Sequence, residues 1–567
     1  MNCEDKIYSN EYIEIITEFE LTKESSLIFG PDYCYQPISE CFGFATVHNY
    51  VQNYYNFSRY GYSYIPKVYS ILQEDLAFDT FNLSQSGIYN LQQPPSNLTG
   101  QGVVIGFIDT GIDYTNPVFQ TNEGSTRILG IWDQTLPGGT HPEGISYGTE
   151  FKEAEINDAL KSDNPLSMVP TKDENGHGTA IASVACGSRL DGGTQFLGAA
   201  PDSRIAVVKL KPAKKYLRDY YLVPDDAVCF QESDILAGLR YLNSFAISLS
   251  RPLVICLALG TNLGGHTGDS KLADMLTRIA EKKSRAVVVG GGNEGLAAHH
   301  YKGSLSSVKP EDLVEINVSA PNEGFVVEFW GQNPYLFTVT VRSPRGEVSP
   351  PASLRSEERQ IFDLVLEKSK IEFDALTIEQ NTGRLLIVIR IVNPSAGVWQ
   401  VSVKNTSNTV GGEFDMFLPI TEFLSHDVTF LSPSPASTIT NPGYSSPSMT
   451  VVAYDATTKS VSPTAGKGYN LNGGIKPDLV VPGINIPTIL GRRSGSSFAA
   501  AIAAGGIAQL LQWGVINKHD ILMDSGDIVN YMIRGATRQP DLTFPNSTWG
   551  YGIMNLEQVF TYLASVT

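Results

Sequence analysis

Long apolar runs without polar interruption begin near residue 102. Residues 103–108 are apolar apart from one glycine, and a run of this length fits a strand buried on both faces of a parallel sheet. Similar apolar runs cover 205–208, 253–257 and 286–289. The stretches 235–242 and 272–282, which lie between these runs, have apolar residues at helical spacing. Strands that alternate with helices predict an α/β fold with a doubly wound parallel sheet.

A different pattern fills residues 313–430. Short β-rich segments such as 325–330 and 385–391 are separated by turn clusters, and no convincing helix interrupts the series. Alternating short strands and turns are typical of antiparallel architectures. We therefore predict an inserted antiparallel β-sandwich or jelly roll, which we place at 311–444.

The first 80 residues predict a separate small α+β unit. Residues 12–19 alternate enough to form a strand, and 47–55 fit a short helix. Residues 76–87 then look like an exposed link. Helical sequence returns at 497–513, so the α/β core is expected to comprise 81–310 and 445–567.

Composition and charge narrow the classes of function. A chain of 567 residues should hold two to four domains. Its net charge of −18 disfavours nucleic acid and anionic membranes as partners, although solubility alone explains the charge. The longest apolar runs are too short to cross a bilayer, so we expect no membrane span. The polar N-terminus lacks the apolar stretch of a secretory signal peptide.

The six cysteines are scattered along the chain without a CxxC pair. In a large chain this distribution is typical of buried, reduced side chains. We therefore expect an intracellular or spore-like compartment rather than secretion.

Three short strings each place one reactive side chain among small residues. Asp109 ends the first apolar run in Asp-Thr-Gly, His177 stands in Asn-Gly-His-Gly-Thr, and Ser497 in Gly-Ser-Ser-Phe-Ala-Ala. A serine hydroxyl is a poor nucleophile near neutral pH and needs a base whose tautomer a third group fixes. The chain order Asp, His, Ser is one of the known orders of a hydrolytic triad. These three residues are the predicted catalytic residues.

A developing oxyanion needs hydrogen-bond donors. Ser497 opens a helix of small residues, so its own N–H would point at the reacting oxygen. Asn293, in the glycine loop 290–295 after a buried strand, is the predicted side-chain donor. Taken singly, each of these residues has a structural alternative. Asp109 and Asn293 are as typical of a helix cap or a turn as of a catalytic site, and His177 is as typical of a structural role. The combination, in the required order and context, points to catalysis.

The remaining histidines and acidic loops give no metal site. His299 and His300 lie near the glycine loop and could line the cleft, but a third ligand at recognisable spacing is missing. The loop 191–193 is too generic to assign. The predicted chemistry requires no cofactor, and metal ligands stay unassigned.

These strings resemble the subtilase family of subtilisin-like serine proteases over roughly residues 85–310 and 445–567. The resemblance implies Asp109, His177 and Ser497 as the triad and Asn293 as the oxyanion donor. It implies a substrate pocket built from Ala258, Leu259, Gly260, Gly290, Gly291 and Gly292.

The same resemblance assigns a role to the N-terminal unit. It implies that residues 1–80 are a prodomain, a chaperone and inhibitor that is removed autocatalytically. We place that cut within 79–86. Structural calcium is common in the family, but no residues here can be assigned to it.

A narrower resemblance, to the Csp germination proteases of clostridial spores, rests on 131–135, 147–150, 295–301 and 549–552 together with the β-rich insertion. It implies a protein substrate, the zymogen of a spore cortex-lytic hydrolase activated by limited proteolysis, and a prodomain that can stay bound. It implies a location in the spore cortex or coat, with the cytoplasm as the alternative. Some members of that group have lost triad residues and act in germinant signalling, whereas this chain keeps all three.

Two departures from the family pattern leave the reacting groups in place. Ser496 replaces the usual threonine and Ala501 the usual proline, so only Ser496 has to be excluded as a second nucleophile. Two other functions stay open, an idle binding or signalling protein and a general degradative protease. Self-cleavage that disappears in Ser497→Ala would exclude the first, and indifference to unrelated unfolded proteins would exclude the second.

Overall fold

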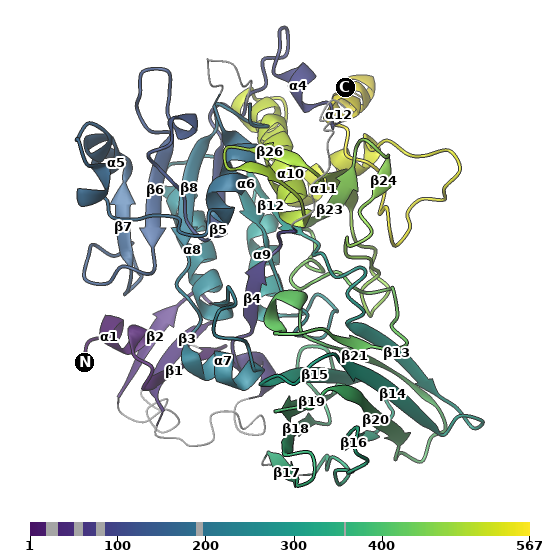
Figure 1. Cartoon of the computed structure of the whole chain (residues 1–567). Coiled ribbons are helices and arrows are strands. Elements are labelled where there is room, and N and C mark those ends of the chain that lie inside the picture. Colours follow the sequence, from purple (N-terminus) through teal and green to yellow (C-terminus); the bar gives the residue numbers. More distant parts are fainter. Residues whose placement is uncertain (19–31, 50–60, 75–85, 189–196, 356–358, 567) are drawn as a thin grey trace.

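A nine-stranded sheet forms the centre of the molecule (Figure 1). The computed structural model describes residues 1–566 except 19–31, 50–60, 75–85, 189–196 and 356–358. Seven strands of the sheet run parallel, and the antiparallel strands β7 (Thr149–Lys152) and β24 (Ser460–Val461) lie at its edges. The parallel strands are β6 (Ile128–Asp133), β8 (Arg204–Lys209), β5 (Val104–Asp109), β10 (Leu253–Leu257), β12 (Arg285–Gly290), β23 (Met449–Asp455) and β25 (Leu479–Pro482). The predicted α/β fold with a parallel sheet is confirmed.

Helices cover both faces of this sheet, which explains why the interiors of its central strands are apolar. Ile105 and Phe107 of β5 share a core with α6 (His177–Cys186) and α10 (Ser496–Leu511). The alternate residues of β5 share the opposite core with α8 (Glu232–Ser248) and α9 (Lys271–Ala280). Because successive side chains of a strand point to opposite faces, a doubly covered strand is apolar along its interior, and the polar residues of β5, β6 and β8 lie at the strand ends.

Helix α10 is the only described helix that is long and apolar enough, together with its extension to Ile516, to cross a membrane. The apolar window within Ser496–Ile516 is 83% buried inside the protein. Its small residues allow close packing, since a Cβ on Gly505 would lie 2.4 Å from the Cβ of Ala199. The apolar character of α10 is therefore that of a core helix.

The N-terminal unit contains α1 (Cys3–Tyr8) and a three-stranded antiparallel sheet in the order β1 (Tyr12–Thr17), β3 (Gly43–His48), β2 (Tyr33–Pro37). The strand predicted within 12–19 is present. The helix predicted at 47–55 is wrong where the chain is described, because Val47 and His48 pair with β1, and 50–60 lie outside the described residues. β-branched and aromatic residues favour that pairing.

A disulfide joins Cys3 of α1 to Cys34 of β2. The expectation of reduced cysteines is therefore wrong for this pair, which only the packing of the helix on the sheet brings together. Cys186, Cys229 and Cys256 are free and buried, and Cys41 is free and exposed.

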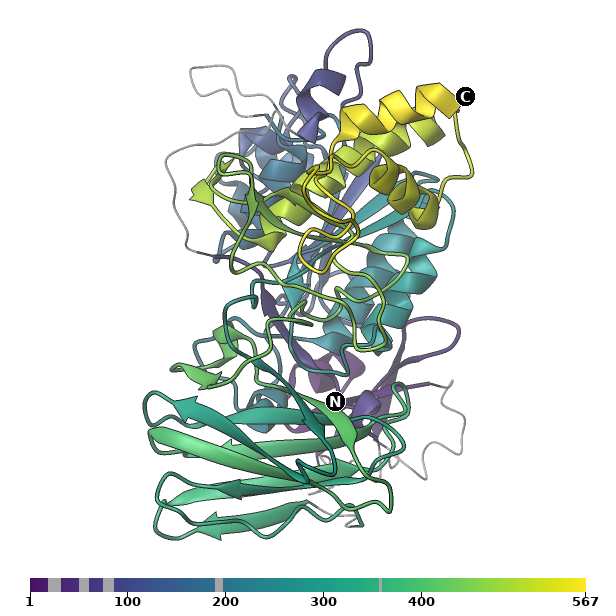
Figure 2. The same ribbon diagram turned by 90° about the vertical axis from the view of Figure 1, so that its right-hand side faces the viewer.

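The inserted region consists of two antiparallel sheets that pack through one apolar core and lie below the α/β core in Figure 2. The six-stranded sheet contains β13 (His300–Leu305), β21 (Gly412–Phe417), β15 (Gly324–Gly331), β19 (Leu385–Val392), β18 (Ser369–Leu376) and β17 (Gln360–Leu364). The four-stranded sheet contains β16 (Phe337–Arg342), β20 (Gly397–Asn405), β14 (Glu311–Val318) and β22 (Val428–Phe430). The first strand of the inserted region, β13, begins at His300, eleven residues before the predicted boundary at 311.

The chain after the N-terminal sheet enters the α/β core as strand β4 (Val68–Ile71) (Figure 1). β4 lies between β11 (Leu259–Gly260) and β9 (Phe230–Gln231) and runs antiparallel to both. The N-terminal unit therefore contributes the middle strand of a small sheet at the carboxyl ends of the core strands.

Candidate active site

The fold brings Asp109, His177 and Ser497 to one edge of the central sheet. Asp109 is the last residue of β5, His177 the first of α6 and Ser497 the second of α10. Carboxyl ends of parallel strands are where open α/β sheets place their sites. The three residues predicted from separate strings thus lie on helices and a strand at this one edge of the sheet.

Asp109 and His177 form a buried pair. The Asp109 Oδ1 lies 2.8 Å from Nδ1 of His177, and both side chains are fully buried. The same carboxylate oxygen accepts hydrogen bonds from the backbone N–H of Thr110 at 2.7 Å and from its hydroxyl at 3.2 Å. A carboxylate fixed in this way holds the imidazole in the tautomer that leaves Nε2 free as a base.

The remaining ring nitrogen is available for chemistry. Among the described residues, His177 Nε2 is buried and has no hydrogen-bond partner. The His177 ring packs edge-on against Phe498, the residue after Ser497, with ring centroids 6.1 Å apart. Nucleophile and base thus belong to neighbouring segments, and catalytic hydrogen bonds are often completed only when the reaction proceeds.

The Ser497 hydroxyl meets a peptide carbonyl rather than the imidazole. Its Oγ donates a hydrogen bond to the carbonyl oxygen of Leu72 at 2.6 Å, and the Ser497 N–H points to the same oxygen at 3.4 Å. Leu72 immediately follows β4. A carbonyl from the N-terminal unit therefore occupies the place where a scissile carbonyl would lie.

Asn293 is placed beside that carbonyl. Its Oδ1 accepts the N–H of Ser496 at 3.0 Å, which fixes the amide, while its Nδ2 is buried without a hydrogen-bond partner in the described chain. A Cβ on Gly495, whose φ is +129°, would lie 2.6 Å from the Leu72 oxygen and 3.3 Å from Asn293 Nδ2. Only glycine lets carbonyl and amide approach this closely.

Ser496 is not positioned as a nucleophile. Its hydroxyl donates to the carbonyl oxygen of Gly292 at 2.7 Å, and the residue is fully buried. That hydrogen bond joins the start of α10 to the glycine loop and helps to orient Asn293. The second hydroxyl of the Gly-Ser-Ser string is thus a structural one.

The segment that carries Leu72 lies in the cleft as an extended strand. Leu259 pairs with Ile71 and Gly260 with Ser70, and the Leu72 N–H donates to the carbonyl of Ala258 at 3.2 Å. Beyond Leu72, the Glu74 N–H donates to the carbonyl of Ser494 at 3.0 Å. Backbone pairing on both sides of Leu72 fixes its carbonyl against Ser497.

The Leu72 side chain enters a pocket between two glycines. A Cβ would lie 2.8 Å from a Leu72 methyl if added to Gly260, and 3.0 Å if added to Gly290. Cβ atoms added to Gly291 and Gly292 would instead meet Val452 and Thr440. Four of the six predicted pocket residues therefore contact the bound segment, and the other two shape the loop behind it.

Asp173 is a positioning residue that the sequence motifs did not indicate. Its carboxylate accepts from the N–H of Gly176 at 2.8 Å and from the N–H and hydroxyl of Thr179 at 2.9 and 2.7 Å. It thereby caps the first turn of α6 and orients His177. An aspartate four residues before a helix-opening histidine is the only local signal, and it is a weak one.

The other candidate ligands have structural partners. His299 Nδ1 lies 2.5 Å from Glu294, and His300 contacts Asp415 at 3.0 Å. The described residues contain no group of three or more His, Cys, Asp or Glu side chains arranged to hold a metal ion. The loop 191–193 lies outside the described residues.

The chain belongs to the subtilase family of subtilisin-like serine proteases, whose sequence profile matches residues 100–322 and 420–552. Those ranges include the whole constellation of Asp109, His177, Asn293 and Ser497. The matched part omits most of the β-sandwich, as expected for an insertion into a family core.

Among solved structures, the chain is similar to the CspB protease of Clostridium perfringens. The two share 30% of residues over 85% of this chain and 98% of that one, with a TM-score of 0.74. The narrower resemblance noted from the sequence is therefore confirmed.

Curated relatives match over shorter ranges. The Arabidopsis thaliana subtilisin-like proteases SBT3.6 and SBT2.2 are 26% and 33% identical to it, over 35% and 19% of this chain. These matches cover only 26% and 15% of the plant proteins' own lengths.

Proposed function

We propose that this protein is a serine endopeptidase that cleaves its own Leu72–Gln73 bond. The observation that carries the proposal is the 2.6 Å contact between Ser497 Oγ and the Leu72 carbonyl oxygen. The cut expected within 79–86 falls almost wholly outside the described residues. The contact between Ser497 and Leu72 favours cleavage earlier in the chain, at the Leu72–Gln73 bond.

The reaction follows from the placement of the groups. Ser497 Oγ attacks the Leu72 carbonyl carbon while His177 Nε2 takes its proton, and Asp109 stabilises the imidazolium. The oxyanion receives hydrogen bonds from the Ser497 N–H and from Asn293 Nδ2. His177 then returns the proton to the nitrogen of Gln73, the C–N bond breaks, and water hydrolyses the acyl-enzyme by the same relay.

Residues 1–72 are proposed to act as a prodomain that stays docked after the cut. Glu14 of β1 is 1% exposed and accepts hydrogen bonds from Gln231 and Ser233 of the core. Tyr62 donates to Glu328 of the β-sandwich at 2.6 Å. None of these contacts depends on the Leu72–Gln73 bond, so its cleavage leaves the interface intact.

The biological role proposed is activation of another protein by limited proteolysis during spore germination. The likeness to the CspB protease supports it. The substrate would be the zymogen of a spore cortex-lytic hydrolase, met in the cortex or coat of a bacterial spore.

Mass spectrometry of the purified chain beside its Ser497→Ala variant tests the catalytic proposal. The wild type should give fragments that end at Leu72 and begin at Gln73, and the variant should stay intact. An intact wild-type chain would contradict self-cleavage and favour an idle binding protein. Incubation with a cortex-hydrolase zymogen then tests the substrate.

A further inference from the structure

The oxyanion donor Asn293 stands in a loop that is rich in glycine. Glycines occupy positions 290–292 and 295, and glycine leaves the backbone more conformations than any other residue. A hydrogen-bond donor supports a reaction only if it is held within about 0.5 Å of its productive position. The loop must therefore be fixed by contacts with other parts of the protein.

The backbone on both sides of the donor is fixed by the α/β core. The carbonyl oxygen of Gly292 accepts the Ser496 hydroxyl at 2.7 Å. The Gly295 N–H donates to the carbonyl oxygen of Thr464, also at 2.7 Å. Between these two fixed positions, the orientation of the donor depends on how the next residue, Glu294, is held.

Glu294 is held by the inserted β-sandwich. It is 4% exposed, and its Oε1 accepts the N–H and the hydroxyl of Thr421 at 3.1 and 3.0 Å. Thr421 opens the short helical turn Thr421–Phe423 between β21 and β22 of the inserted region. Because a buried carboxylate is stable only where it is hydrogen-bonded or paired, these donors determine where the Glu294 side chain points.

The second carboxylate oxygen of Glu294 has partners on both sides of the same junction. Glu294 Oε2 lies 2.5 Å from Nδ1 of His299, which directly precedes β13, and accepts Nδ2 of Asn262 at 3.2 Å. The same Asn262 amide donates to the carbonyl oxygen of Leu418, the residue after β21, at 3.1 Å. Burial opposes the charge of Glu294, but His299 and the Thr421 donors outweigh it and lower the pKa of the carboxyl.

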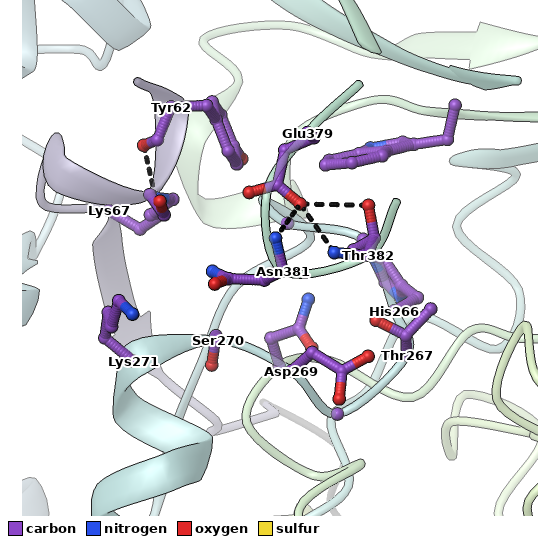
Figure 3. Close-up of a pocket in the computed structure, with 16 residues that line it drawn as sticks. Tyr62, Lys67, His266, Thr267, Asp269, Ser270, Lys271, Glu379, Asn381 and Thr382 are labelled. Atoms are coloured by element: carbon purple, nitrogen blue, oxygen red, sulfur yellow. Dashed lines mark hydrogen bonds between the residues drawn. The ribbon is translucent and has the colours of Figure 1, made fainter. Parts of the chain in front are cut away.

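The β-sandwich also contacts the loop that carries Asn262. His266 Nε2 lies 3.0 Å from the carbonyl oxygen of Asn262, and the His266 ring stacks on Phe417 of β21 with ring centroids 3.8 Å apart. Figure 3 shows His266 beside the turn of residues 379–382, which follows β18 and is capped by the Glu379 carboxylate. The two loops that bind the Glu294 carboxylate are thus both in contact with the sandwich.

We infer that Glu294 is a positioning residue for the oxyanion donor, and that through it the alignment of Asn293 depends on the inserted β-sandwich. The inference rests on the proposed function, which assigns Asn293 to the oxyanion of the Leu72–Gln73 cleavage. The sandwich follows the loop directly, since β13 begins at His300, seven residues after Asn293. The insertion is therefore part of the catalytic apparatus rather than an appended domain.

The rate of self-cleavage tests the inference without an added substrate, because the Leu72–Gln73 bond already lies at Ser497 in the uncut chain. The full chain is made by cell-free translation and followed over time, and a first-order rate constant that is independent of dilution reports cleavage within one molecule. Glu294→Ala should lower this rate constant about 10- to 100-fold, the effect of a small misplacement at the site. In the Asn293→Ala background the same change should lower it less than about threefold, because no amide remains to be positioned.

This double-mutant comparison separates positioning from a general loss of structure. A merely structural role predicts that Glu294→Ala slows cleavage by the same factor whether Asn293 is present or replaced by alanine. That result, or a wild-type rate in Glu294→Ala alone, would overturn the positioning role.

Thr421→Val tests the contribution of the β-sandwich with a milder change. It keeps the size of the side chain and removes the hydroxyl that donates to Glu294, so the rate should fall about three- to tenfold, and only where Asn293 is present. Thr429→Val makes the same change at a half-buried position of β22 and is the matched control, with a rate within about twofold of the wild type. Equal rates in the two variants would contradict the dependence on the sandwich.

The outcomes distinguish this inference from the proposed function. If the wild type cuts its Leu72–Gln73 bond and Glu294→Ala does so equally fast, only the positioning role fails and the endopeptidase stands. If the wild-type chain fails to cut itself, the endopeptidase proposal fails, and the inference fails with it. Urea midpoints in the uncut Ser497→Ala background show whether each variant folds, and the Thr421→Val comparison decides if Glu294→Ala does not.

Discussion

The catalytic centre and the Glu328 carboxylate at the N-terminal interface are both buried polar sites, but their hydrogen bonding differs. At the centre, His177 Nε2, Asn293 Nδ2 and Asp109 Oδ2 are buried without hydrogen-bond partners among the described residues. At the interface, the carboxylate of Glu328 accepts hydrogen bonds from Tyr62, Gly264 and Trp330.

The difference separates groups that react from groups that bind. An unpartnered buried polar atom costs free energy and persists where a proton or charge will appear during a reaction. A partnered one stabilises a fixed arrangement. Asn293 Nδ2 lies beside the Leu72 carbonyl and Asp109 holds His177, whereas the partnered Glu328 carboxylate ties Tyr62 of the N-terminal unit to the β-sandwich.

The sharpest test of this contrast is at the nucleophile. Ser497→Ala should abolish processing, with a rate at least ~10⁴-fold lower, because no other hydroxyl among the described residues is placed to attack the Leu72 carbonyl. Mass spectrometry over a time course measures it. Ser496→Ala is the matched control and should still process, since its hydroxyl is bound to Gly292. Loss of processing in Ser496→Ala alone would reverse the assignment.

Asn293→Ala removes the unpartnered amide. We expect the processing rate to fall about 10²–10³-fold while the chain stays folded, because the amide acts mainly on the oxyanion. Quantifying intact and cut chain against time gives the rate. Asn530→Ala, on an exposed position of α11 (Ser525–Arg534), is the control. A normal rate in Asn293→Ala would exclude Asn293 as the oxyanion donor.

At the interface the expected effect is on stability rather than on rate. Glu14→Ala removes the acceptor of the Ser233 hydroxyl and one of the two acceptors of the Gln231 amide, together with a charge 3.9 Å from Lys211. The cost should be about 2–4 kcal/mol in free energy of unfolding. Urea unfolding in the uncut Ser497→Ala background measures it. Glu11→Ala, at an exposed position of the same unit, should change stability by less than ~0.5 kcal/mol. Equal effects of the two variants would contradict the contrast.

The smallest effect depends on pH. Burial, with the Glu294 and Glu74 carboxylates, raises the pKa of Glu422 from 4.5 to about 8. A carboxyl whose pKa is raised by folding contributes stability below about pH 4.5 and loses it as the pH rises toward 8. The stability of Glu422→Gln relative to the wild type should therefore increase, on the order of 1 kcal/mol, as the pH rises from 5 to 8.

Urea midpoints at the two pH values measure this gain. Glu281→Gln, an exposed carboxylate at the end of α9, is the control and should show no such pH dependence. A gain that is the same at pH 5 and pH 8 would rule out titration of Glu422 as its cause.

Residues whose role depends on local context could be predicted from the sequence. Asp109 follows an apolar run, and His177 and Ser497 open helices of small residues, so each string indicated both its element and its side of the sheet. The Asp109–His177 contact then joins residues 68 positions apart. The place of the Ala258–Gly260 segment and Gly290 in the substrate pocket was implied by the family resemblance rather than by local pattern.

Residues that act through long-range pairing could not be predicted in this way. The Cys3–Cys34 disulfide depends on how α1 packs against β2, and the strand at 43–48 depends on β1 and β2 as partners. β-structure is decided by cross-strand neighbours more than by intrinsic preference. The helix expected at 47–55 failed for that reason where the chain is described.

The sequence by itself determined the α/β core and the three reacting groups, because apolar periodicity and short motifs are local properties. Only the tertiary structure decided that Leu72 lies at Ser497, and that Glu294 beside Asn293 is held by Thr421 of the inserted region. A strand's register is set by backbone pairing with segments some 160 to 190 residues away, as between β4 and its partners β9 and β11, and no local pattern encodes that distance.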